Sequence, residues 1–140
     1  MTDGIELTRN TKNRRFDEER GQAMVELAIV LPIFLMLVFG IIQFAIVFNH
    51  YQTLTDAVRV GARQAAISRN LSNPTAVTEA RLRKAAQASL QDSDLAVEVD
   101  SSWAQGSDVT VRASYPYEIN IIGVVVKSGR LKSETTERVE

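Results

Sequence analysis

The chain has 140 residues, one histidine, no cysteine and a formal net charge of −1 at neutral pH. This composition excludes disulfides and thiolate chemistry, gives no basic surface for nucleic acid, and argues against a metal-dependent enzyme, so no metal or cofactor is predicted. The mean hydropathy is near zero, but the average hides one strongly apolar segment that follows a polar amino terminus.

Residues 23–48 form that apolar segment, in which only Glu26, Pro32, Gly40 and Gln43 are not plainly apolar. As a helix it would extend ~39 Å, which is enough to cross the hydrocarbon core of a bilayer. The core of a cleaved secretory signal is only about 7–15 residues long and precedes a small-residue cleavage site, which is missing here. The segment therefore predicts a transmembrane helix that tolerates Pro32 with a mild kink.

Basic residues are more numerous before this segment than after it. Those before it are Arg9, Lys12, Arg14, Arg15 and Arg20, and those at a similar distance after it are Arg59, Arg63 and Arg69. Because the side of a membrane span richer in Lys and Arg stays in the cytoplasm, we expect a cytoplasmic amino terminus. The predicted organisation is a leader at residues 1–21, a transmembrane helix at 22–48 and an extracytoplasmic domain at 49–140.

The helix is predicted to continue beyond the membrane, because apolar residues recur after Phe48 at three- and four-residue spacing. These are Leu54, Ala57, Val58, Ala62, Ala65 and Ala66. One helix from about residue 22 to about residue 68 is therefore expected. After a turn, Asn73 can cap a second helix that has Pro74 in its first position and runs to about Leu90.

The period then changes to two, which predicts strands. The alternating residues are Leu95, Val97 and Val99, followed by Val109, Val111, Ala113 and Tyr115. The turn-rich link at 101–108 indicates an antiparallel hairpin. Residues 119–126 are compatible with a loop, a short helix or a strand. Residues 127–130 are expected to form a turn, and residues 131–139 are compatible with a third, edge strand. The expected architecture is α+β, with the small antiparallel sheet packed on the outer half of the first helix, residues 49–68.

Glu26 is the one acidic residue in the apolar segment, and it has two explanations. A carboxylate in a membrane helix is costly and normally needs a partner; near the interface it can simply reach the lipid headgroups. The second explanation is a nearby cation. If the chain were cut after Gly21, the new α-amino group of Gln22 would be largely protonated at neutral pH, about one helical turn from Glu26.

Two blocks of sequence resemble a known family. The first is Arg20-Gly21 and Gln22-Ala23-Met24-Val25-Glu26 before an apolar run that includes Pro32, which is similar to a class III prepilin leader with its cleavage site. The second is the segment 56–66, with Ala57, Arg59, Gly61, Ala62 and Arg63 in an A-x-R-x-G-A-R pattern. Together they resemble the TadE-like proteins of tight-adherence (Tad/Flp) pilus systems, although Leu27 stands where an aromatic residue is common.

The resemblance implies a minor pilin or pseudopilin that a prepilin peptidase cuts between Gly21 and Gln22. Its partners would be the membrane, that peptidase, other pilins and the pilus assembly platform, with Glu26 pairing subunits. No small-molecule substrate is implied. Arg59 and Arg63 would either pair with acids of a sister pilin or face solvent and phospholipid, and Gly61 would either permit a close approach or be tolerated.

Two other classes of protein compete with this interpretation. An uncleaved, single-pass signal-anchor protein with an extracytoplasmic binding domain would have the same topology, without processing at Gly21 or any need for Glu26. An enzyme is not expected, because the sequence contains no nucleophile–base pair, paired carboxylates or phosphate-binding loop. The scattered acids Asp92, Asp94 and Asp100 are explained as solvated loop residues.

Overall fold

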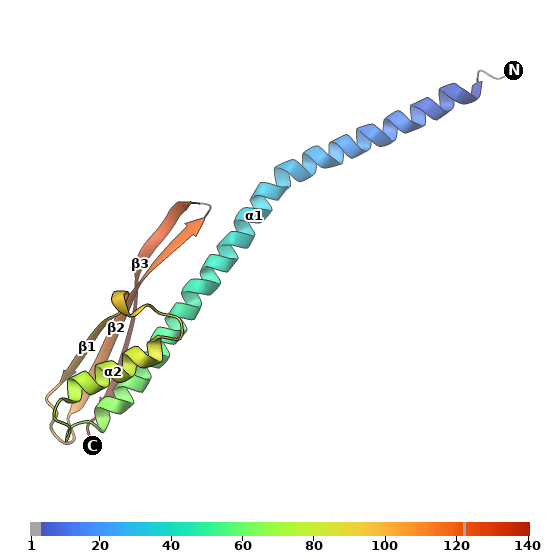
Figure 1. Ribbon diagram of the computed structural model, residues 1–140. Helices are drawn as coiled ribbons and strands as arrows, with labels where there is room; N and C mark the ends of the chain where they lie inside the picture. The colour runs from blue at the N-terminus through green and yellow to red at the C-terminus, as the bar shows by residue number, and fades with distance from the viewer. Residues whose placement is uncertain (1–3, 122) are drawn as a thin grey trace. The chain divides into compact units, whose positions relative to one another are not determined.

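The computed structural model describes the backbone of residues 4–121 and 123–140, and side chains from Glu19 onward within those ranges. The elements in chain order are α1 (Gly4–Ala66), α2 (Pro74–Ala86), the short 3₁₀ turn η1 (Asp92–Asp94), β1 (Ala96–Ser101), β2 (Asp108–Ile121) and β3 (Val124–Arg138) (Figure 1). A long apolar helix, a second helix and a three-stranded antiparallel sheet confirm the α+β prediction.

Contacts divide the chain into two compact bodies. The amino-terminal body, up to Ile41, is the first part of α1. The carboxy-terminal body, Ile42–Glu140, contains the rest of α1, α2 and the sheet. The core described below belongs entirely to the second body.

Helix α1 begins far earlier than the predicted start at Gln22, because it already includes Gly4. Residues 4–21 contain no proline and include four arginines, three glutamates and one lysine, which have high helix propensity. A single Gly21 weakens a helix by only about 1 kcal/mol, so it does not end this one. The predicted leader is therefore continuous in secondary structure with the apolar segment from Gly4 onward; its side chains before Glu19 lie outside the described residues.

The other end of α1 is close to its predicted position, at Ala66 instead of Ser68. The backbone N–H of Ser68 donates to Ala65 O at 3.0 Å, a tighter pattern than that of an α-helix. The buried Ser68 hydroxyl donates to Gln64 O at 2.6 Å. These bonds satisfy the last turn where the chain leaves the helix.

Helix α2 starts as its sequence predicts. The Ala76 N–H donates to Asn73 Oδ1 at 3.0 Å, and Pro74 occupies the first turn, where its missing N–H is harmless. The helix ends at Ala86, before the expected Leu90, although Leu90 is itself buried.

Removing this cap gives a first prediction. Replacing Asn73 with alanine is expected to lower the free energy of unfolding by about 1 kcal/mol, because the Ala76 N–H loses its acceptor. Denaturant unfolding of the full chain in a mild detergent would measure the loss. Asn70→Ala, an exposed position in the same connection, is the matched control, and an equal loss in both variants would contradict the capping role.

The sheet has the order β1-β2-β3, and both pairs are antiparallel. The predicted β1–β2 hairpin is confirmed, with Val97 opposite Ala113 and Val99 opposite Val111. The third strand is also confirmed as an edge strand, but it starts at Val124 and is much longer than expected. Residues 119–126, left open by the sequence, end β2 and begin β3; Ile122 among them lies outside the described residues.

The turn predicted at 127–130 is wrong, because β3 runs straight through these residues. The reversal occurs at Gly123, whose φ of +83° suits glycine. Gly129, which suggested the turn, pairs instead with Tyr117. A Cβ placed on Gly129 would lie 3.0 Å from the Tyr117 ring, so this glycine makes room for an aromatic side chain on the neighbouring strand.

One face of the sheet packs against α1 and α2 and forms the core of the second body (Figure 1). The core residues are Leu54, Ala57, Val58, Ala62 and Ala65 of α1, Leu82 and Ala86 of α2, and Leu90, Leu95, Val109, Val111, Ala113, Tyr115 and Val139. This arrangement confirms that the sheet packs on the outer half of the first helix. It also explains the period-two and period-3.6 patterns, since each apolar face is buried against the other.

Candidate functional site

The residues of the predicted cleavage junction are accessible. Gly21, Gln22 and Glu26 are all exposed on α1, and among the described side chains that are not adjacent in sequence none lies within 4 Å of a Cβ placed on Gly21. In the single chain, the Glu26 side chain is therefore not buried by the described residues. An exposed carboxylate on an apolar helix is suited to contacts with lipid headgroups or with another subunit.

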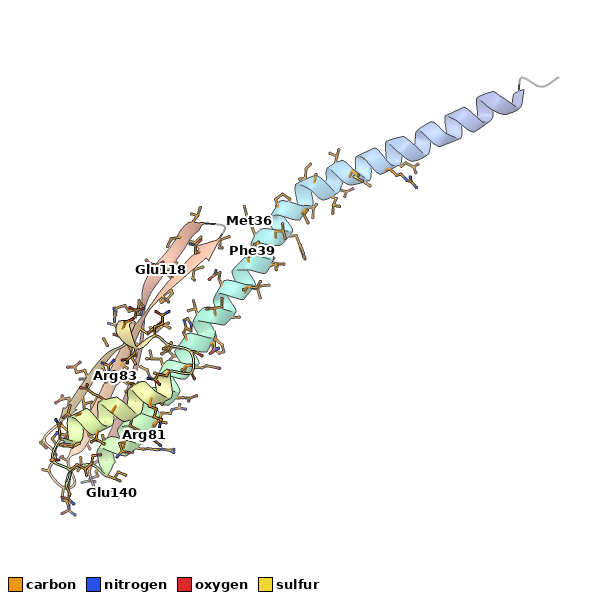
Figure 2. The ribbon with its side chains drawn as sticks, in the orientation of Figure 1. Met36, Phe39, Arg81, Arg83, Glu118 and Glu140 are labelled. Atoms are coloured by element: carbon orange, nitrogen blue, oxygen red, sulfur yellow. The ribbon has the colours of Figure 1, made fainter. Side chains whose placement is uncertain are left out.

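Most apolar side chains around Glu26 are also exposed. Met36 and Phe39 stand out from α1 with 57% and 43% of their surface exposed (Figure 2). One helix within the described residues is long and apolar enough to cross a membrane, with a mean hydropathy of 2.8 in its most apolar window and none of that window buried. Water is a poor environment for such a surface, so the helix indicates a single-pass, membrane-anchored protein.

The second sequence block turns out to be a packing surface. Ala57, Gly61 and Ala62 are buried in the face of α1 that meets α2 and the sheet. A Cβ added to Gly61 would lie 3.1 Å from both Cβ and Cδ1 of Leu82. Of the two roles that the sequence left open for Gly61, the structure supports a close approach, and the approaching element is α2.

The two arginines of this block are separated from that core. Arg59 Nη1 lies 3.7 Å from Oδ1 of Asp56, three residues earlier on the helix, and both side chains are mostly exposed. Such a pair contributes little to stability. Arg63 is exposed in the last turn of α1 and borders an open depression with Glu137 and Arg138. Of the two roles predicted for these arginines, exposure to solvent describes both in the single chain. Both side chains remain available to a partner.

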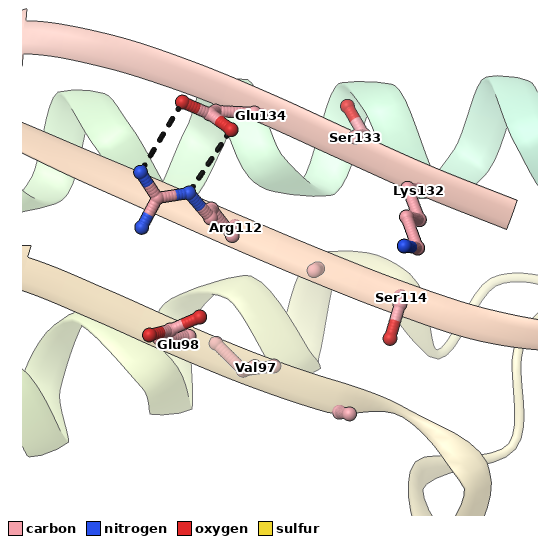
Figure 3. Close-up of a pocket in the computed structure, with 9 residues that line it drawn as sticks. Val97, Glu98, Arg112, Ser114, Lys132, Ser133 and Glu134 are labelled. Atoms are coloured by element: carbon pink, nitrogen blue, oxygen red, sulfur yellow. Dashed lines mark hydrogen bonds and ion pairs between the residues drawn. The ribbon is translucent and has the colours of Figure 1, made fainter.

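The outer face of the sheet has a charged row that the sequence did not reveal. Glu98, Arg112 and Glu134 are aligned across the three strands, and Arg112 Nε donates to Glu134 Oε2 at 3.0 Å (Figure 3). This hydrogen bond, together with the negative charge of Glu134, raises the pKa of the Arg112 guanidinium. Alternation predicts which residues of a strand face outward, but the row exists only because of the register between strands.

The row lies in a shallow depression of about 360 Å³ that also includes Ser114 and Lys132. Its side chains are largely exposed, so it is a surface for polar contacts and not an enclosed pocket. Among the residues whose side chains are described, no group of three His, Asp or Glu could hold a metal ion.

A comparison with known families identifies part of the chain. Residues 21–63 match the family described as TadE-like protein. The match begins at Gly21 and ends at Arg63, so it covers both blocks that carried the resemblance except Arg20 and residues 64–66, and it confirms that resemblance. No curated protein and no solved structure matches the chain.

Proposed function

We propose that this chain, which carries a TadE-like segment at residues 21–63, is a minor pilin-like or pseudopilin-like membrane subunit of a Tad/Flp-type pilus system. The family match supports an association with such a system, and its start at Gly21 is the observation that carries the proposal. The exposed apolar helix supports the membrane anchor. The subunit would act in pilus biogenesis, adhesion or secretion.

In this proposal the leader keeps the amino terminus in the cytoplasm until a prepilin peptidase cuts after Gly21. The mature chain would start at Gln22, and Glu26 would be its fifth residue. Helix α1 could then leave the lipid and pack with helices of other subunits. Such an assembly repeats one heterologous contact without closing, and the carboxy-terminal body would stay on its outside.

Glu26 would set the register of this packing. Between apolar helices its carboxylate needs a cation, and the α-amine of Gln22 on a neighbouring subunit supplies one. The exposure of Glu26 in the single chain supports such a contact, because no interaction within the described residues has to be broken first. A subunit with a large outer body suits the start or the tip of a fibre.

A Gly21→Arg variant tests the proposal. The intact mass and amino-terminal sequence would be measured for the wild-type chain and the variant, each isolated from membranes that contain a competent prepilin peptidase. We expect a wild-type chain that starts at Gln22 and a variant that keeps its leader, because arginine in place of glycine adds a long charged side chain at the cleaved bond.

Gly40→Arg is not a suitable control, since it would place a charge inside the membrane. Gly4→Arg, which lies in the same leader far from the junction, is the matched control and should be cleaved normally. A full-length wild-type chain would overturn the proposal and leave an uncleaved signal-anchor protein with an extracytoplasmic binding domain.

A further inference from the structure

The far end of the β2–β3 hairpin has an unusual surface. The last residue of β2 that pairs with β1 is Ser114, so beyond it β2 pairs with β3 alone, and the hairpin extends past β1 and α2 (Figure 1). At its end Val124, Val125 and Val126 are 65%, 51% and 62% exposed. Three consecutive exposed valines on an edge strand would promote aggregation in water unless something covers them.

The direction of this hairpin is fixed by two contacts with α1 in the same body. At one end the Glu140 N–H donates to Ala66 O at 2.9 Å. At the other end the rings of His50 and Tyr115 meet edge to face, 5.6 Å apart. Strand β2 therefore runs antiparallel to the part of α1 in this body, in the direction from Ala66 toward Ile42.

Simple geometry gives the reach of the hairpin. Ile121 comes six residues after Tyr115, which corresponds to ~20 Å of strand. The helix from His50 back to Ile42 is only ~12 Å long. The end of the hairpin therefore extends along the whole apolar stretch of α1 that belongs to this body. On that stretch Gln43, Val47 and His50 are half-buried, whereas Phe44 and Phe48 remain exposed.

The charges next to the turn complete the pattern. Three basic residues follow the valines on β3: Lys127, Arg130 and Lys132. In β2 beyond Ser114, residues 115–121, the one acidic residue is Glu118 (Figure 2). Apolar side chains at a tip with Lys and Arg behind them match a membrane interface, where the tip enters the acyl boundary and the cations reach lipid phosphates. A two-stranded hairpin has unpaired edges, so it cannot go into the hydrocarbon core itself. Residues 42–48 beside it would therefore lie at the outer interface, and residues 23–41, ~29 Å of helix, would cross the core.

We propose that the hairpin end, with Ile121 and the valines at 124–126, inserts into the outer headgroup region of the same membrane that anchors α1. Lipid is the occupant that the structure favours, because the valines continue the exposed apolar surface of a helix that already lies in lipid. The contact would hold the carboxy-terminal body close to the membrane. It depends on the anchoring of α1 and on the outside location of this body, but not on cleavage or pilus assembly.

Fluorescence of a single label tests this proposal, because the chain has no cysteine of its own. Val125→Cys would carry an environment-sensitive fluorophore, in the full-length chain reconstituted into phosphatidylethanolamine–phosphatidylglycerol vesicles. Gln105→Cys, exposed in the β1–β2 connection at the opposite end of the sheet, is the matched control. We expect blue-shifted emission at position 125 that is quenched more by lipids spin-labelled near the headgroup than by lipids labelled deep in the chain, and water-like emission at position 105.

Water-like emission at both positions would overturn the proposal. So would a blue shift at position 125 that spin-labelled lipids do not quench and that grows with the protein-to-lipid ratio, since this would mean that a second copy covers the tip. Adding Val124→Asp and Val126→Asp should abolish the quenching at position 125. Aspartates at Ser102 and Ala104, which are exposed at the far end, should leave it unchanged.

Discussion

Replacing Gly61 with valine is expected to lower the free energy of unfolding of the carboxy-terminal body by about 1–3 kcal/mol, the usual cost of overpacking a core. The reason is the contact between α1 and α2. Even a single Cβ on Gly61 would lie 3.1 Å from two carbons of Leu82, and valine adds two further methyl groups. The two helices would have to separate, which would open the core around the fully buried Leu54 and Val58.

Trp103 provides the measurement, because it is the only tryptophan in the chain and packs half-buried against this core. Its fluorescence during denaturant unfolding, with the full chain in mild detergent, would give the stability of each variant. Gly40→Val is the matched control, since no atom lies within 4 Å of a Cβ there. It is the same substitution in the same helix and should change the midpoint little.

A double variant makes the cause specific. Leu82→Ala alone should cost about 2–5 kcal/mol, because Leu82 is fully buried. In that background, however, Gly61→Val should cost less than it does in the wild-type chain, since alanine keeps the Cβ of Leu82 but lacks the Cγ and Cδ1 atoms that valine would also meet. Strictly additive losses would contradict the contact, because neighbouring residues are expected to be coupled.

Glu26→Gln is expected to prevent the chain from joining an assembly of pilins while leaving it in the membrane and correctly processed. Removing one partner of a buried ion pair costs about 3–5 kcal/mol, which corresponds to more than a hundredfold loss in an association constant. Glutamine keeps the size of the side chain and removes only its charge. The effect should therefore appear in assembly and not in membrane insertion, which becomes easier without the charge.

The measurement is the fraction of the protein that co-purifies, after crosslinking in cells that contain the pilus system, with other pilin-like subunits. Glu19→Gln provides the control: it is also an exposed acid on α1, but it precedes Gly21 and would be removed with the leader. Equal recovery of Glu26→Gln and the wild type would contradict the pairing role of Glu26. It would leave the processing test at Gly21 unaffected.

Much of this fold could be predicted from the sequence because its signals are local. Asn73 and Pro74 define a helix start by their own chemistry, and the alternation from Val109 to Tyr115 marks one buried face of a strand. The change of period from 3.6 to two separates helix from sheet. The two family blocks were equally readable, since they depend on the order of residues and not on their arrangement in space.

The parts that the sequence did not settle depend on contacts between distant residues. Gly129 within Lys-Ser-Gly-Arg suggests a turn, yet it belongs to a strand because Tyr117 covers it. Either role for Gly61 was compatible with the helical pattern, and only the position of Leu82 decides between them. The row formed by Glu98, Arg112 and Glu134 requires the register of two strand pairs, which no local pattern specifies.

The position of Val139 has a consequence for export. This residue, which directly follows β3, is almost fully buried, and its backbone N–H donates to Ser107 O at 2.8 Å, so the end of the chain closes the core against α1. During translocation from the amino terminus, the alanine face of α1 (Ala57, Ala62 and Ala65) would emerge first and remain uncovered. It would stay so until Val139 had also crossed the membrane. On the proposed topology, the body therefore cannot complete its fold while the translocation channel still holds residues that follow β3. Interrupting export late should leave a chain that extracytoplasmic proteases degrade.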